Sequence, residues 1–217
     1  MAGSIMQYVL YLAVLVVLAI PLGTYMKKVM YGEKTIFSSI FTPCERIVCK
    51  VLHVQESEDM TWKQYLSSVF LFSGIGFVFL FLLQLLQGAL PGNPQGLAGT
   101  SWHLAFNTAA SFVTNTNWQS YSGESTLSYL TQAVGLTVQN FVSAATGIAV
   151  LFALIRGFTR VKAKGIGSFW VDMTRIVLHI LIPLNLVLAL ILVAGGVVQN
   201  TTQEKELMLT EPVAVSA

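Results

Sequence analysis

Charged side chains are scarce in this chain, and their scarcity sets its class. Only 10% of its 217 residues are Asp, Glu, Lys or Arg, against about 25% in ordinary soluble domains. Hydrophobic residues make up 54% of the chain, and the mean hydropathy is +0.69. This composition excludes a typical soluble domain and predicts an integral membrane protein, with the lipid bilayer and not a nucleic acid as its surroundings.

Residues that commonly carry out chemistry are also few. The three histidines, His53, His103 and His179, are scattered, with no Ser/His/Asp arrangement and no metal-ligand spacing around them. The two cysteines, Cys44 and Cys49, fall in a segment that we place in the cytoplasm, where disulfides are rare. The sequence contains neither a P-loop nor a DKTGT-like phosphorylation motif. We therefore expect a non-catalytic protein without an organic cofactor, and any ATP chemistry must belong elsewhere.

What the sequence does contain is four apolar runs of about 20 residues or more, the length at which a helix crosses a bilayer. The first, Ile5–Met26, lacks a basic start and is too long for an ordinary signal peptide. We expect an all-α membrane protein with the following parts: a leading transmembrane helix in 1–30; a cytoplasmic connector in 31–65, with a surface helix at Thr42–Val54; a unit in 66–155 with spans Leu66–Leu86 and Ala133–Ile155; a basic loop and the span Trp170–Val197 in 156–197; and an outer stretch in 198–217.

The positive charges predict the orientation of these spans. Eleven of the twelve Lys and Arg residues flank the first and third connectors, and the segment 89–126 carries none. Membrane proteins keep such an excess of Lys and Arg on the cytoplasmic side. The N-terminus, the segment 89–126 and the C-terminal stretch are therefore predicted to face outward.

Between the second and third spans lies a segment, Ser101–Glu124, that is too short and too polar at its end to cross a membrane. Trp102–Val113 is predicted to form a short helix capped by Thr100 or Ser101, about 18 Å long. Thr114–Gln119 has no amphipathic period and is dense in small polar groups. Irregular backbone at membrane depth survives only when it is buried in protein or lines a wet cavity. We therefore predict a re-entrant loop and a candidate functional site.

The electrostatics of this loop favour a cation. The C-terminal end of a helix that points into the membrane carries partial negative charge, and a following loop can replace ion hydration with carbonyl oxygens. Thr hydroxyls and Asn amides can add further oxygens. The lack of Lys and Arg fits a cation path, and Glu124 at the outer end either attracts cations or is simply a solvated carboxylate.

Polar and small residues inside the spans allow more than one interpretation. Gln139, Ser143 and Thr146, with Asn140 beside them, form either interhelical hydrogen bonds or the wall of a polar cavity. Gly74 and Gly76 are predicted to permit close helix packing. The charged group of the fourth span, formed by Asp172, Arg175 and His179, is interpreted as an interfacial anchor in preference to an ion relay.

Physical reasoning alone leaves open a passive cation channel and a structural subunit whose polar loop only packs against neighbours. Several motifs resemble a known family, the potassium-binding subunits of the bacterial Kdp potassium-transporting P-type ATPase. They are TNTNWQSYSGE at Thr114–Glu124, GLTVQN ending at Asn140, IAVLFALIRGFTR at Ile148–Arg160, NPQ at Asn93–Gln95, and WVDMTRI at Trp170–Ile176.

The resemblance implies that the chain binds external potassium at a selectivity filter in the bacterial inner membrane. The filter would consist of Thr114, Asn115, Thr116 and Asn117, with Gln119 beside them and Trp118 and Glu124 as support. The ion would pass to a partner P-type ATPase subunit that hydrolyses ATP, in a complex with small accessory membrane subunits. The transported potassium is the only ion implied.

The same resemblance implies a longer protein with four potassium-channel-like repeats, each a span, a pore loop and a span. This chain contains one complete repeat, with a pore helix at 102–113 and a filter loop at 114–119, and the first span of a second. One loop cannot encircle an ion. We therefore expect either a fragment or truncated product, or a chain that assembles with copies or other subunits.

Overall fold

Four helical segments of the computed structural model are long and apolar enough to cross a membrane: Ile5–Met30, Trp62–Ala89, Thr131–Thr159 and Phe169–Ala194. The structure describes residues 2–55, 57–160 and 165–197. All regular elements within those ranges are helical. Their bounds are α1 Ala2–Met30, α2 Ser38–Val51, α3 Trp62–Leu86, η1 Gln87–Ala89, α4 Trp102–Val113, α5 Gly123–Thr126, η2 Thr131–Thr137, α6 Val138–Thr159, α7 Phe169–Arg175, η3 Ile176–Leu181 and α8 Ile182–Ala194. The four predicted spans and the all-α class are confirmed, whereas the predicted outer stretch 198–217 lies outside the described residues.

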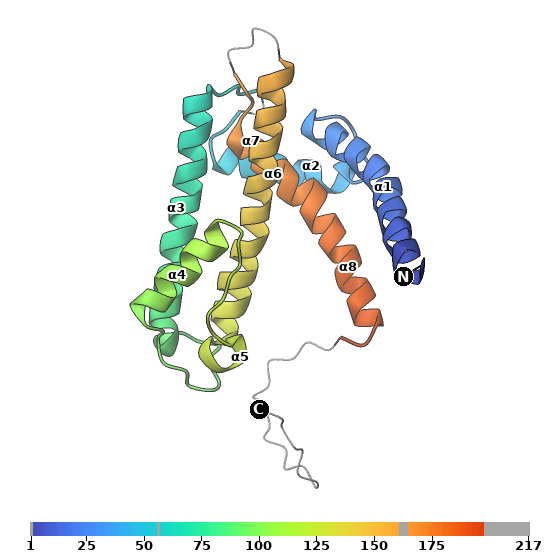
Figure 1. Cartoon of the computed structure of the whole chain (residues 1–217). Helices are drawn as coiled ribbons and strands as arrows, with labels where there is room; N and C mark the ends of the chain where they lie inside the picture. Colours follow the sequence, from blue (N-terminus) through green and yellow to red (C-terminus); the bar gives the residue numbers. More distant parts are fainter. Residues whose placement is uncertain (1, 56, 161–164, 198–217) are drawn as a thin grey trace.

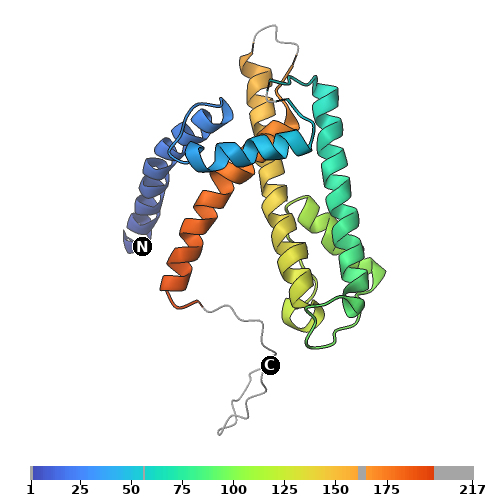
Figure 2. The ribbon, with the colours of Figure 1, turned by 180° about the vertical axis from the view of Figure 1, so that it is seen from behind.

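α3 and α6 run side by side in opposite directions, with the shorter α4 packed against both (Figure 1). The connector between α1 and α3 and the C-terminal end of α6, which both carry basic residues, lie at one end of the long helices (Figure 2). α4, α5 and the N-terminus of α1 lie toward the other end. The geometry thus separates the basic connectors from the Lys- and Arg-free segment 89–126.

α2 runs across the spans near the end where the basic connectors lie (Figure 2). It begins at Ser38, so the predicted start at Thr42 was wrong, and Pro43 lies inside the helix. The additional turn places Phe41 with its ring centroid 5.7 Å from that of His179 on η3. This packing contact could not be foreseen from the residues around Pro43, because it depends on how the distant fourth span is placed.

Two apolar clusters hold the helices together. The larger one joins the C-terminal end of α1, the start of α3, α6, α7 and η3; its buried members include Tyr65, Ala145, Ala149 and Phe169. Alanines spaced four apart on α6 are small enough to let neighbouring backbones approach closely. The second cluster lies under the segment Ser101–Glu124 and contains Leu80, Ala109, Phe112, Leu127 and Leu136. It fixes α4 against α3 and η2.

Both of the later spans contain a wider, π-helical turn near their start, at η2 and at η3. Pro183 follows η3 and has no N–H to donate to the carbonyl of His179, four residues earlier. The hydroxyl of Tyr25 on α1 donates to that carbonyl at 2.5 Å. A neighbouring helix therefore satisfies a backbone acceptor that the proline leaves open, as membrane spans require. α1 packs through Tyr25–Met30, whereas its residues 5–24 are exposed.

The two glycines of the second span differ in their surroundings. A Cβ added to Gly76 would lie 2.5 Å from Oε1 of Gln139 on α6, whereas a Cβ on Gly74 would meet nothing within 4 Å. The predicted close helix packing is therefore confirmed at Gly76. At Gly74, no atom of the described residues comes close enough to need a glycine.

The backbone of Gly99 lies still closer to a neighbour, because an added Cβ would overlap with the backbone carbonyl of Leu85. Gly99→Ala is expected to lower the free energy of unfolding by about 1–3 kcal/mol, since backbone atoms must move to make room. The measurement is SDS-induced unfolding of the purified protein in mixed micelles. Gly74→Ala is the matched control, with an expected gain or no change because alanine favours helix. Equal stability of the two variants would contradict the close approach at Gly99.

Candidate functional site

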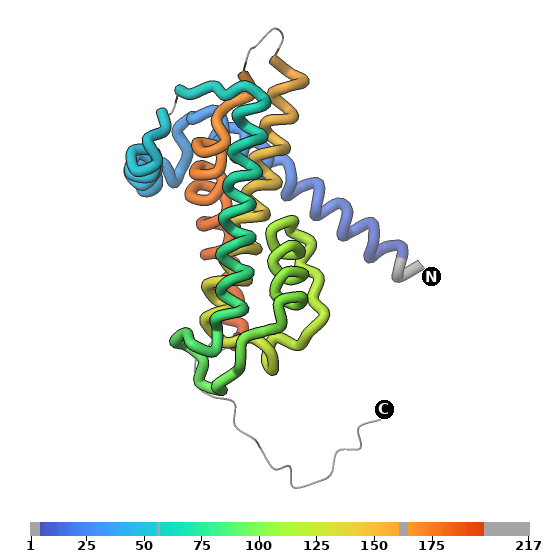
Figure 3. The backbone as a smooth tube through the Cα atoms, turned by 90° about the vertical axis from the view of Figure 1, so that its left-hand side faces the viewer, coloured from blue at the N-terminus to red at the C-terminus, as the bar shows by residue number. Residues whose placement is uncertain are grey.

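The segment Ser101–Glu124 starts and finishes at the same end of the long helices. α4 rises from that end along α3 and α6 and stops partway, and the chain then runs back toward α5 (Figure 3). α4 covers the same residues as the predicted helix, and Ser101 caps it by accepting a hydrogen bond from the Leu104 N–H at 3.4 Å. The candidate loop therefore lies at the C-terminal end of α4, where the partial charge of the helix is negative.

Two asparagines shape the turn that follows α4. Asn115 and Asn117 have φ of 58° and 56°, the left-handed region that asparagine adopts more readily than most side chains. The backbone N–H groups of Thr114–Asn117 all donate back into the last turn of α4, and those of Thr116 and Asn117 share the Ser111 carbonyl at 2.9 and 3.2 Å. The Trp118 N–H donates to the Ser111 hydroxyl at 2.6 Å. The last turn of α4 thus accepts hydrogen bonds from the backbone N–H groups of Thr114 to Trp118.

With the N–H groups held in this way, the loop carbonyls are left for other partners. Among the residues that the structure describes, none of the four carbonyl oxygens of Thr114–Asn117 accepts a hydrogen bond. The side chains from Thr114 to Gln119 are exposed. Carbonyl oxygens of this kind are the ligands with which pore loops replace the water around a potassium ion. The structure therefore brings the four predicted filter residues together and leaves their backbone carbonyl oxygens available to bind an ion.

α6 holds the loop from one side. Nδ2 of Asn117 donates to Oδ1 of Asn140 at 2.7 Å, and the Ser143 hydroxyl donates to Oδ1 of Asn115 at 3.2 Å. Neither Asn140 nor Ser143 was among the predicted site residues. The signal was present in the sequence, because polar residues at helical spacing marked this face of the third span, but spacing alone could not say which loop they would meet.

The other predicted residues lie farther along the loop. Trp118 is 67% exposed, so the described part of the chain covers only a minor share of its side chain, and its packing role stays a prediction. Nε2 of Gln119 donates to the Tyr121 hydroxyl at 3.3 Å, and burial raises the pKa of Tyr121. Glu124 is exposed, and a hydrogen bond from the Ser122 hydroxyl at 2.7 Å lowers its pKa. Glu124 is therefore ionised at neutral pH.

Gln87, the first residue of η1 directly after α3, connects the two flanks of this segment. Its Nε2 donates to the carbonyls of Ala98 and Thr126 at 2.7 and 2.8 Å, and its Oε1 accepts from the Ser128 N–H at 3.1 Å. The side chain is fully buried. Sequence reasoning missed Gln87, because one glutamine at the end of an apolar run resembles an interfacial residue.

At the opposite end of the spans lies a group of buried ion pairs. Arg156 on α6 binds Asp172 on α7 through two hydrogen bonds, one of them from Nη2 to Oδ1 at 2.8 Å, and the Tyr65 hydroxyl donates to the same carboxylate. Asp172 is only 2% exposed. Interpreting Asp172 as part of an interfacial anchor was therefore wrong, because α6 supplies a buried partner for it.

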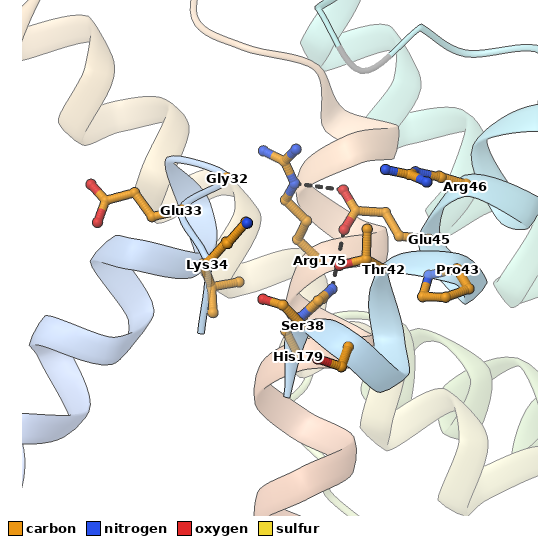
Figure 4. A pocket seen from close by; sticks show the side chains of 12 residues that line it. Gly32, Glu33, Lys34, Ser38, Thr42, Pro43, Glu45, Arg46, Arg175 and His179 are labelled. Atoms are coloured by element: carbon orange, nitrogen blue, oxygen red, sulfur yellow. Dashed lines mark hydrogen bonds and ion pairs between the residues drawn. The ribbon is translucent and has the colours of Figure 1, made fainter. Parts of the chain in front are cut away.

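Glu45 provides the second set of ion pairs. It accepts hydrogen bonds from Nε of Arg175 at 2.7 Å and from Nε2 of His179 at 3.1 Å (Figure 4). The three side chains line a cavity of about 510 Å³ between α2, η3 and the loop after α1. Burial raises the pKa of Glu45, but hydrogen bonds from His179 and Arg175 outweigh it and lower the pKa overall. In the described ranges, no three His, Cys, Asp or Glu residues gather in a way that could hold a metal ion.

Comparison with known proteins identifies the family. A family model described as the potassium-transporting ATPase A subunit matches residues 9–215. The chain belongs to this family. Among similar proteins, the potassium-transporting ATPase potassium-binding subunits of Clostridium botulinum and Clostridium perfringens are 61% and 60% identical over 215 residues. Each alignment covers 99% of this chain and 37% of the relative.

A relative from Listeria welshimeri with the same printed name is 61% identical over 196 residues, which is 90% of this chain and 35% of that protein. The chain thus spans a little over a third of the length of the family members that it matches. Together with its four long apolar helices, membership of this family makes it a multi-pass membrane protein.

Proposed function

We propose that this chain supplies one pore loop of a potassium path and binds external potassium through oxygens of Thr114, Asn115, Thr116 and Asn117. The observation that carries the proposal is the loop geometry. The N–H groups turn back into α4, while four carbonyl oxygens are left without hydrogen bonds from the described residues at the negative end of that helix. The names of the relatives support potassium as the ion.

In this proposal the unit 66–155 is one span–loop–span repeat, and other loops complete the ring of oxygens around the ion. The irregular backbone of 114–120 supports this arrangement. It is exposed in this chain, and irregular backbone at membrane depth must be surrounded by other protein or by water. Trp118 and Gln119 would then meet those neighbouring loops, and Glu124 would attract cations at the outer mouth.

The chain itself is proposed to be non-catalytic and to pass the ion to a partner P-type ATPase subunit, in a complex with small accessory membrane subunits. The relatives are named as subunits of a transporting ATPase, which supports a partner ATPase subunit. The basic connectors are proposed to face the cytoplasm across the bacterial inner membrane, with the loop outside.

Gln119→Arg in the complete transporter is expected to raise the external potassium concentration for half-maximal uptake by about tenfold or more. The added cation would stand beside the proposed binding oxygens and repel the ion. The measurement is potassium uptake by cells against external concentration, with expression checked on membranes. Gln95→Arg is the matched control, because it adds the same charge on the same side but outside the loop.

Unchanged uptake by the Gln119→Arg transporter would overturn the potassium site. ATP dependence separates the pump from a passive channel. Uptake by the purified and reconstituted transporter should require ATP, and potassium flux that needs no ATP would favour the channel instead.

A further inference from the structure

We propose that Asn140 on α6 is a positioning residue that fixes the side-chain amide of Asn117, so that its oxygen and not its nitrogen faces the ion path. The inference rests on the proposed function and adds a selectivity device to it. Asn140 lies outside the loop, 23 residues farther along the chain, and would act on the ion only through Asn117.

The hydrogen bond between these two asparagines has a direction. Nδ2 of Asn117 donates to Oδ1 of Asn140 at 2.7 Å, close to the short end of the usual N–H···O range. An amide carries its nitrogen and its oxygen on opposite sides of one carbon. Holding the nitrogen toward α6 therefore turns Oδ1 of Asn117 away from α6. Among the described residues, no hydrogen bond occupies that oxygen, so it is available as a ligand.

Without Asn140 the amide could rotate about its terminal bond. Such sp³–sp² torsions are broad and roughly two-fold, so nothing intrinsic to asparagine selects one orientation. In the rotated orientation the NH2 group would face the cation, and a donor repels a cation where an acceptor binds it. A pore loop discriminates by the number and strength of its oxygen dipoles, and one reversed amide changes both.

The backbone conformation makes this support more necessary. Asn117 lies in the left-handed region, and the residue between the two left-handed asparagines, Thr116, is exposed. Ser143 ties Asn115 to the same helix at 3.2 Å, so α6 touches both left-handed residues. The single Ser143 O–H is shared between Oδ1 of Asn115 and the Asn140 carbonyl, each at 3.2 Å, which links the two supports. α6 thereby supports the loop along one side.

The test is the potassium-to-sodium selectivity of uptake by the complete transporter carrying Asn140→Leu. Leucine keeps a similar size but cannot accept a hydrogen bond. Competing sodium raises the potassium concentration needed for half-maximal uptake. This increase should be about three- to tenfold larger in the variant than in the unchanged transporter, the range expected for one lost hydrogen bond. Asn140→Ala serves as a second variant if leucine prevents assembly.

Asn140→Asp separates the orientation of the amide from simple support of the loop. A carboxylate can only accept, so it keeps Nδ2 of Asn117 in place, and near-normal selectivity is expected. Thr146→Val is the control, because the Thr146 hydroxyl donates at 2.9 Å to the Val142 carbonyl of its own helix. Its selectivity should not change.

Normal selectivity in both Asn140→Leu and Asn140→Ala would overturn the inference, and so would a loss in Asn140→Asp as large as in Asn140→Leu. These outcomes are distinct from failure of the proposed function, which is read from Gln119→Arg. Impaired uptake there with normal selectivity in the Asn140 variants would leave the potassium site in place and remove only the positioning role.

Discussion

Asp172→Ala is expected to lower the free energy of unfolding by about 3–5 kcal/mol, because the change leaves Arg156 as an uncompensated charge in a buried site. The Arg156 side chain is only 10% exposed and has two nitrogens on the lost carboxylate. The Tyr65 hydroxyl loses the same acceptor, although it keeps the Ala149 carbonyl at 2.9 Å. SDS-induced unfolding in mixed micelles measures the change.

Two controls test the reason for this loss. Arg160→Ala removes an exposed ion pair with Asp59, in which the side chains are 40% and 47% exposed, and should cost less than about 1 kcal/mol. The double variant Arg156→Met with Asp172→Leu removes both buried charges and should recover much of the loss. A double variant as unstable as Asp172→Ala would show that the unpaired charge is not the cause.

Glu45→Ala is expected to have an effect of similar size, about 3–5 kcal/mol, because it strips Arg175 and His179 of one shared acceptor. Glu45 is 6% exposed and, together with the ring contact of Phe41 on His179, connects α2 to the fourth span. The unfolding measurement is the same, with Glu33→Ala as control. Glu33 is exposed in the same connector and makes no ion pair within the described residues, so its loss should change stability by less than about 0.5 kcal/mol.

The same contact predicts acid sensitivity. The pKa of Glu45 is lower in the folded protein than its ordinary value of 4.5, so the unfolded chain binds the proton more readily. The stability that ionised Glu45 provides is therefore fully present above pH 4.5 and is lost as the pH falls through the lowered pKa. Glu45→Gln should be less stable than the unchanged protein at neutral pH, with the difference shrinking below pH 4.5. A constant difference across that range would contradict the ionised state of Glu45.

The sequence predicted the parts of this molecule that depend on local patterns. Apolar runs of sufficient length predicted the spans, and a capping serine followed by an apolar period predicted α4. The sequence-based predictions were wrong or incomplete where the structural role of a residue depends on a partner far along the chain. Asp172 and Glu45 resemble surface carboxylates in sequence, because their partners Arg156 and His179 are 16 and 134 residues away. Asn140 and Gln87 were missed as supports of the loop for the same reason.

The loop itself lies between these two cases. The residue types of Thr114–Asn117 predicted a site rich in oxygen, whereas the direction of its carbonyls depends on two positive φ angles and on the Ser111 carbonyl. Backbone direction leaves little trace in residue types beyond the choice of asparagine for left-handed positions. The Ser143 contact with Asn115 likewise emerges only when α4 is packed against α6.

The π-helical turn at Thr131–Thr137 has a consequence for the rotational phase of the third span. A π turn holds one more residue than an α turn, and each residue of an α-helix advances the helix by about 100°. Thr131, which is buried and bonded to Ser128, therefore keeps its phase relative to Asn140 although the wide turn holds one residue more than an α turn. Deleting one residue of η2 would let this turn close to an ordinary α turn, whereas deleting Val138 or Gln139 from α6 would turn the two groups by roughly 100° against each other. A single deletion at the start of α6 would thus misalign the span with the loop even though every side chain of the loop remained unchanged, and the same deletion within η2 would not.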